Sequence, residues 1–166
     1  MKQGAYQRQL ILYLKNKSYQ QAYEFAKQYV AEYPEDMIAH FLLAKSSVWV
    51  KNFEEAAHEA RIAYNMADSP EDMMMCGIHA CVAYYKLKEF AKGFELLRAM
   101  ERIRICEESE QLFFLFSLAL DNAAETSRHF KEMFRINNDA AAAFLKNLAG
   151  DASIDYERLF QNTDRI

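Results

Sequence analysis

The sequence predicts an all-α fold of about four stacked, antiparallel helix pairs, and three observations carry this prediction. First, a Lys, a polar residue and an aromatic residue recur together, at 17–19, 51–53 and 88–90. Second, a small residue follows each aromatic three positions later, as Ala22, Ala56 and Gly93. Third, the 166 residues include only four Gly and two Pro, which leaves little material for hairpins. A recurring period of this size is typical of stacked helical repeats.

The first repeat is expected over residues 5–34. Apolar residues at helical spacing predict a helix over Ala5–Lys15, which breaks at the first corner. Ser18 is placed to cap the second helix, with Gln21 in the capping-box position. That helix should end before Pro34, because the residue before a proline is pushed out of the α region.

The second repeat is expected over residues 36–68. Asp36 is placed to cap its first helix, and Asn52 its second. Glu55 stands three residues after Asn52, where a capping-box acid can reach back. Small residues then follow at spacings that predict a face pressed closely against neighbouring helices, namely Ala56, Ala60 and Ala63.

The third repeat is expected over residues 69–105. Ser69 followed by Pro70 is the clearest helix start in the chain, because it combines a capping side chain with a proline at the first helical position. The helix should run to about residue 87, and its partner from 90 to about 103.

A degenerate fourth repeat is expected over residues 107–137, with a first helix over 107–120. Asn122 and Glu125 form another capping pair at the start of its second helix. Residues 138–166 depart from the repeat. There we expect capping helices over 139–149 and 154–160 that cover the last apolar face of the stack.

Composition limits the functional classes. The net charge of −4 and pI near 5.6 argue against a nucleic-acid surface. No apolar run approaches the ~18 residues of a membrane span, and the N-terminus lacks the apolar core of a signal peptide. Cys76, Cys81 and Cys106 support neither a disulfide framework nor a zinc site. We therefore expect a single cytoplasmic domain over residues 1–166, with no metal or cofactor, and no enzyme motif is present.

These residues make the chain resemble the tetratricopeptide repeat family. Each repeat in that family has small residues where its helices cross, an aromatic at the corner, and often a final proline. The matching residues are Tyr13, Tyr19, Ala22 and Pro34 in the first repeat, Ala44, Phe53, Ala56, Ala60 and Ala63 in the second, and Cys81, Tyr84, Phe90 and Gly93 in the third. Leu10 and Phe114 replace the usual small residue in the outer repeats. The match covers about residues 5–136.

The resemblance implies a right-handed superhelix, a tetratricopeptide-like α-solenoid, whose concave groove is lined by the first helix of each repeat. The implied partner-binding residues are Ile11, Leu14, Lys15, Ile38, Phe41, Leu42, Lys45, Val48, Trp49, Met75, Ile78, His79, Val82, Tyr85 and Lys86. Most are apolar, and none of the matching positions carries the group needed for the family's carboxylate clamp. The groove is similar in character to that of tetratricopeptide chaperones of bacterial secretion systems.

Two functional hypotheses follow. The first is an adaptor, scaffold or chaperone that binds an apolar peptide or amphipathic helix of a protein partner in the groove. The second is a structural homodimer, in which a second copy covers the groove or the Phe-rich face around Phe113, Phe114 and Phe116. Residues 154–160 folding back onto the groove is a further possibility.

Overall fold

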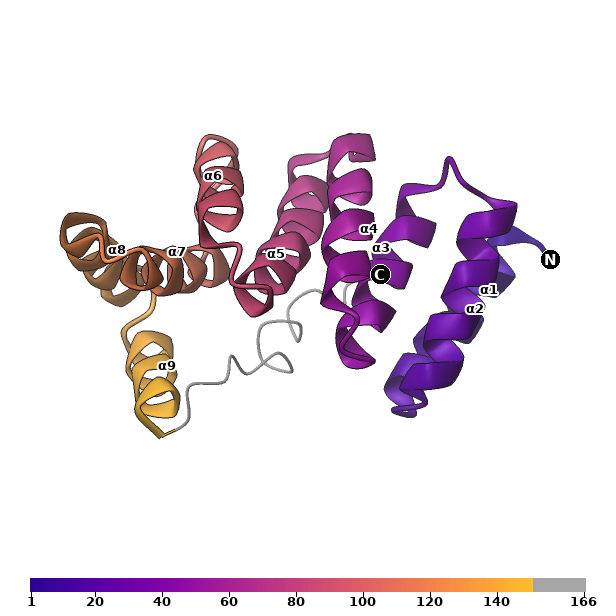
Figure 1. Cartoon of the computed structure of the whole chain (residues 1–166), viewed down its shortest axis with the longest axis horizontal. Coiled ribbons are helices and arrows are strands. Elements are labelled where there is room, and N and C mark those ends of the chain that lie inside the picture. Colours follow the sequence, from indigo (N-terminus) through magenta and orange to yellow (C-terminus); the bar gives the residue numbers. More distant parts are fainter. Residues whose placement is uncertain (151–166) are drawn as a thin grey trace. The chain divides into compact units, whose positions relative to one another are not determined.

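The computed structural model of the protein describes residues 1–150, and the side chains of residues 1–148 (Figure 1). In this part of the chain all regular structure is helical, as the sequence predicts. The helices are α1 (Gln3–Lys15), α2 (Tyr19–Glu32), α3 (Met37–Trp49), α4 (Phe53–Met66), α5 (Pro70–Lys86), α6 (Phe90–Glu101), α7 (Glu107–Ala119), α8 (Ala123–Ile136) and α9 (Asn138–Gly150). The chain divides into an N-terminal unit, Met1–Leu96, and a C-terminal unit, Leu97–Ile166.

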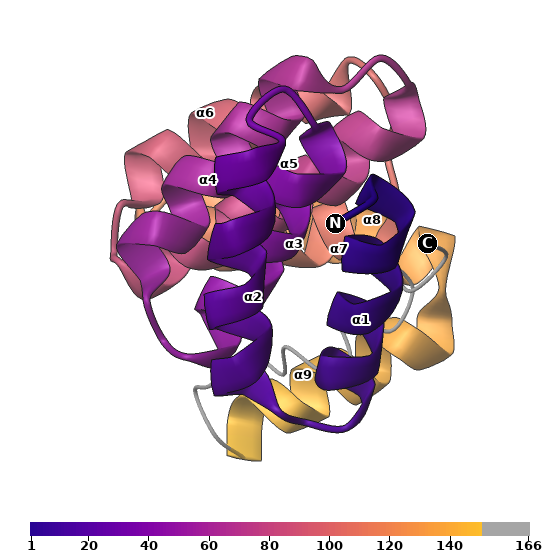
Figure 2. The ribbon, with the colours of Figure 1, turned by 90° about the vertical axis from the view of Figure 1, so that its right-hand side faces the viewer.

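In the N-terminal unit, consecutive helices pack against one another from α1 to α5. Figure 2 looks onto the first pair, in which α1 and α2 run antiparallel. The first helices of successive repeats are also in contact, α1 with α3 and α3 with α5. These three helices therefore form one layer, as a solenoid of helix pairs requires.

The corners of the repeats share one hydrogen-bond pattern. At the second corner, the backbone N–H of Asn52 donates to the Ser47 carbonyl (2.8 Å), and that of Lys51 donates to the Val48 carbonyl (3.0 Å). This is the Schellman arrangement that closes a helix C-terminus, and it needs a residue with positive φ. The four corners supply such residues, with φ of 57° at Lys17, 63° at Lys51, 60° at Lys88 and 52° at Asp121.

The helix starts confirm four expected caps and correct two details. The side chains of Asp36, Asn52, Ser69 and Asn122 each accept a backbone N–H in the first turn of the helix that follows. Ser18 makes no such bond, so its expected cap is wrong. Asn52, with similar backbone angles and a longer side chain, reaches the Glu55 N–H only at 3.4 Å, and the shorter serine falls short.

The expected capping box at Asn52 is also incomplete. The Glu55 carboxylate accepts from the Asn52 side-chain amide (3.1 Å) rather than from its backbone N–H. The reason is that this N–H already donates to Ser47, as part of the corner.

In the C-terminal unit, α7 packs on α8 and α8 on α9. Helix α9 occupies the range in which a capping helix was expected, whereas the expected segment 154–160 lies outside the described residues. Among the described residues, no helix is long and apolar enough to cross a membrane.

Candidate functional site

The predicted groove residues occupy equivalent positions along the layer of α1, α3 and α5. One row of equivalent positions consists of Leu14, Val48 and Tyr85, and the next of Lys15, Trp49 and Lys86. Because α1 contacts α3 and α3 contacts α5, these rows run across neighbouring helices of one unit.

In the middle of this layer the predicted groove side chains are buried. The buried members of the predicted set are Phe41, Leu42, Lys45, Val48, Ile78, His79 and Val82. The ring of Phe41 meets that of His79 edge-on, with centroids 4.7 Å apart, which joins α3 to α5. These side chains therefore contribute to the packing between repeats.

His79 is a buried, neutral histidine within this packing. One of its ring nitrogens, Nδ1, lies 2.9 Å from the carbonyl oxygen of Met75, one helical turn earlier, so the ring N–H donates to that oxygen. Burial, with a smaller effect in the same direction from the positive charge of Lys45, lowers the pKa of His79 to about 3. The imidazole is therefore uncharged at neutral pH.

The two ends of the layer remain accessible. The half-buried or exposed members of the predicted set are Ile11, Leu14, Lys15, Ile38, Trp49, Met75, Tyr85 and Lys86. Trp49 stacks on Tyr19, with ring centroids 4.7 Å apart and planes 6° apart. Tyr85 meets Phe90 edge-on at 5.5 Å. Tyr19 and Phe90 were identified from the sequence only as corner aromatics, and each also packs against an aromatic residue of the predicted groove.

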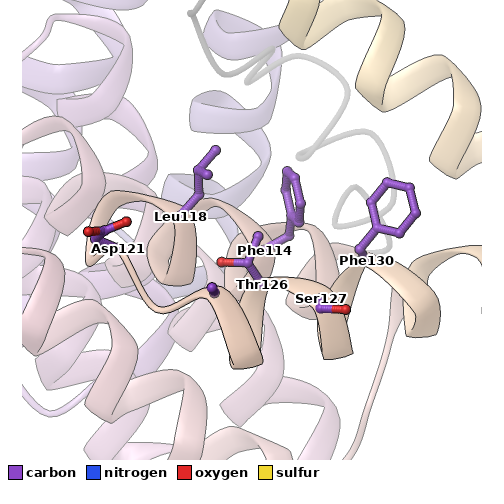
Figure 3. A pocket seen from close by; sticks show the side chains of 7 residues that line it. Phe114, Leu118, Asp121, Thr126, Ser127 and Phe130 are labelled. Carbon is purple, nitrogen blue, oxygen red and sulfur yellow. The ribbon is translucent and has the colours of Figure 1, made fainter.

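A second candidate site lies in the C-terminal unit, between α7 and α8. It is a pocket of about 360 Å³ lined by Phe114, Leu118, Asp121, Ala123, Thr126, Ser127 and Phe130. Figure 3 shows the side chains of Phe114, Leu118 and Phe130 projecting on the same side of the helix pair. The predicted Phe-rich face is different, because Phe113 and Phe116 are buried and only Phe114 borders this pocket. Neither Leu118 nor Phe130 was predicted from the sequence to line a binding site.

A largely buried cluster of ionisable side chains lies where α7 and α8 pack together. The ring of His129 lies flat on that of Phe113, with centroids 4.2 Å apart. Its Nδ1 lies 2.6 Å from a carboxylate oxygen of Glu110, and its Nε2 lies 3.1 Å from Glu125. Arg98 also contacts Glu125 (2.5 Å). The buried Glu110 carboxylate therefore has a hydrogen-bond partner, which is the condition under which buried polar groups are tolerated.

The thiols are not activated for chemistry. Burial raises the pKa of the Cys76 thiol to about 12, and burial also raises the pKa values of Cys81 and Cys106. These thiols therefore stay protonated, and the protonated form is a poor nucleophile and metal ligand. In the described part of the chain, no three His, Cys, Asp or Glu residues are grouped as metal ligands.

Among solved structures, the chain is similar to PilF of Pseudomonas aeruginosa, a protein that contains tetratricopeptide repeats. The TM-score is 0.68, and the alignment covers 90% of this chain and 67% of PilF at 12% sequence identity. A likeness at this identity shows the fold. No family model and no curated protein matches the sequence. The predicted tetratricopeptide-like solenoid of helix pairs is therefore confirmed as the fold.

Proposed function

We propose that the chain is a protein-interaction module that binds an apolar peptide or amphipathic helix along the layer of α1, α3 and α5. The observation that carries this proposal is the set of accessible apolar side chains on these first helices. Leu14 and Tyr85 occupy the two outer positions of one row, whose middle member Val48 is buried, and Ile38 and Met75 occupy neighbouring positions of another row. Accessible apolar side chains of this kind can receive the i, i+3, i+4 and i+7 anchors by which an amphipathic helix lies in a groove.

The accessible part of the layer also carries positive charge. Lys15 is exposed and Lys86 half-buried, and both lie in the same row as Trp49. Lys45, which the resemblance also assigns to the groove, is only 9% exposed. Lys15 and Lys86 can therefore orient acidic groups of a ligand, while the apolar contacts supply most of the affinity at roughly 25 cal/mol per Å² buried.

The experiment uses Trp49, the single tryptophan, as a fluorescence donor. The probe is a synthetic amphipathic helix of Leu and Glu carrying a dansyl acceptor. Saturable quenching of Trp49 by this probe is expected. Phe41 and Val82 are buried, so charged substitutions there would disturb the fold rather than test the surface.

A better test pair lies on α1. Ile11→Glu places a charge in the proposed groove and should weaken probe binding at least about tenfold, because it removes apolar contact area worth more than ~1.4 kcal/mol. Leu12→Glu is the matched control, since Leu12 is 51% exposed on the same helix but about 100° away. Equal losses in the two variants, or no saturable binding by the parent chain, would contradict the proposal.

A further inference from the structure

The face of the α7–α8 pair carries large apolar side chains that the described chain leaves in contact with solvent. Leu118 is 54% and Phe130 41% exposed, and both line the same pocket. Helix α9 reaches the edge of this pocket, where Phe144 meets Phe114 with ring centroids 6.3 Å apart. The exposed fractions are those measured with α9 in place, so α9 does not close the face.

Comparison with the equivalent positions of the second repeat shows which surface of a repeat this face is. The pocket-lining positions correspond, 70 residues earlier, to Ala44, Val48, Lys51, Phe53, Ala56, Ala57 and Ala60 of the second repeat. The Ala and Val residues in that set are buried, and α5 of the following repeat packs on α3 and α4 there. The α7–α8 face is therefore the surface on which a solenoid normally stacks its next helix.

The residues on this face differ from the equivalent residues of the second repeat, and the difference changes which surface can pack against it. Phe114 and Phe130 occupy the positions of Ala44 and Ala60 in the second repeat, where the small side chains allow close helix contact. Two large aromatic side chains therefore border the pocket in place of a flat packing surface. Between these aromatic side chains lie small residues, Ala123, Thr126 and Ser127. The result is a surface with both projecting side chains and a hollow, which is what a self-complementary interface needs.

We infer that a second copy of the chain covers this face, with the two α8 helices antiparallel about a two-fold axis near Thr126. Charge favours this arrangement. Asp121 lies at one end of the pocket, and Lys131 is exposed one turn after Ser127 on the same side of α8. Each lies five residues from Thr126, so the axis brings Asp121 of one copy to Lys131 of the other, twice. The inference concerns a different surface from the proposed groove and does not depend on it.

Analytical ultracentrifugation of the full chain over a range of concentrations tests the inference. We expect a reversible dimer of the 19.4 kDa chain. Phe130→Asp should raise the dissociation constant at least about tenfold. Ile136→Asp is the matched control, because Ile136 is 36% exposed on the same helix but points away from the pocket, and it should leave the constant unchanged. A monomer at all concentrations, as expected if another protein or residues 151–166 occupy the face, would overturn the inference.

A charge exchange tests the geometry without disturbing the apolar face. Asp121→Lys and Lys131→Asp should each weaken the dimer, and the double variant should return to within about threefold of the parent. Position 121 has positive φ, as do Lys17, Lys51 and Lys88 at the other corners, so a lysine is tolerated there. If the double variant is no tighter than the singles, the two-fold pairing is wrong.

Discussion

Glu110 and His129 are joined across the α7–α8 pair by a 2.6 Å contact between Oε2 and Nδ1, and both side chains are buried. They lie 19 residues apart, as do His40 and Glu59, which are joined by an equal contact in the second repeat. The positions correspond across the repeats (40 with 110, 59 with 129), so acid and base have exchanged helices. This position between the two helices of a repeat therefore accepts an acid–histidine pair in either orientation.

Exchanging the two residues should consequently rescue the damage done by changing one. Glu110→His and His129→Glu singly each bury two like groups, which should lower the free energy of unfolding by about 3–5 kcal/mol. The double variant restores an acid–base pair and should recover roughly half of the summed loss or more. Recovery should be incomplete, because a carboxylate at position 129 faces Glu125. Urea denaturation measures all three variants.

The corresponding exchange of His40 with Glu59 is the control from the second repeat. It should follow the same non-additive pattern, since His40 and Glu59 are largely buried as well. If the losses of the single variants simply add in both double variants, the pairs do not act as units and the comparison between repeats fails.

The fold could be predicted from the sequence because its signals are local and repeated. Lys17, Lys51 and Lys88 mark three corners, and Asn122 with Glu125 marks the fourth although its aromatic is missing. Hydrogen bonds within a few residues build all four corners, so short sequence windows contain them. Helix limits at Gln3 and Glu101 differ from the predicted limits by two residues, which is the usual uncertainty at frayed helix ends.

The burial of each side chain could not be predicted from the sequence in the same way. The resemblance to the repeat family assigns Val82 and Trp49 to the same predicted groove, yet Val82 is buried and Trp49 is accessible. Depth depends on which neighbouring repeat covers each position, and a helical period carries no such information. The pair of Glu110 and His129 was missed for a related reason, because its members lie on different helices. The signal that could have revealed it is the reversed order of His40 and Glu59 in the same register.

The stability of the chain should depend on pH through His79. Its pKa is about 3 in the folded chain and 6.5 ordinarily, so between these values the unfolded chain binds more protons. The free energy of unfolding should therefore fall as pH drops from 6.5 toward 3, by up to about 1.4 kcal/mol per pH unit from this residue.

His79→Met should make this dependence shallower. Urea denaturation between pH 4 and 7 measures the slope, and His58→Met is the matched control, because His58 is exposed. Parallel slopes for the parent and the His79 variant would show that burial of this ring is not linked to protonation.

The stacking of Trp49 on Tyr19 provides a second, spectroscopic prediction. Tyr19→Ala removes one face of the contact, so Trp49 emission should shift to longer wavelength as water reaches the indole. The free energy of unfolding should fall by about 1–2 kcal/mol, from lost area and aromatic contact. Tyr33→Ala is the control, since Tyr33 packs with Tyr6 and Tyr29 instead. An equal shift from both variants would mean that the emission reports general loosening.

Substituting a corner lysine with glycine should not destabilise the chain, in contrast to the usual effect of glycine in a helix. Lys51 has a φ of 63°, a conformation that is costly for a residue with a Cβ atom and easy for glycine. Lys51→Gly should therefore leave the free energy of unfolding unchanged or raise it by up to about 1 kcal/mol. Lys51→Val should lower it by about 1–2 kcal/mol, because a β-branched residue tolerates this conformation worst.

An exposed position inside a regular helix gives the opposite result and serves as the control. Gln28 lies in the middle of α2, where glycine costs about 1 kcal/mol through backbone entropy. The difference between the two glycine variants, measured by urea denaturation, isolates the backbone conformation at the corner. If glycine at position 51 destabilises the chain as much as glycine at 28, the left-handed residue does not control the corner. The shared closure of the four repeats would then depend on side-chain packing, with Phe53 and its equivalents the next residues to test.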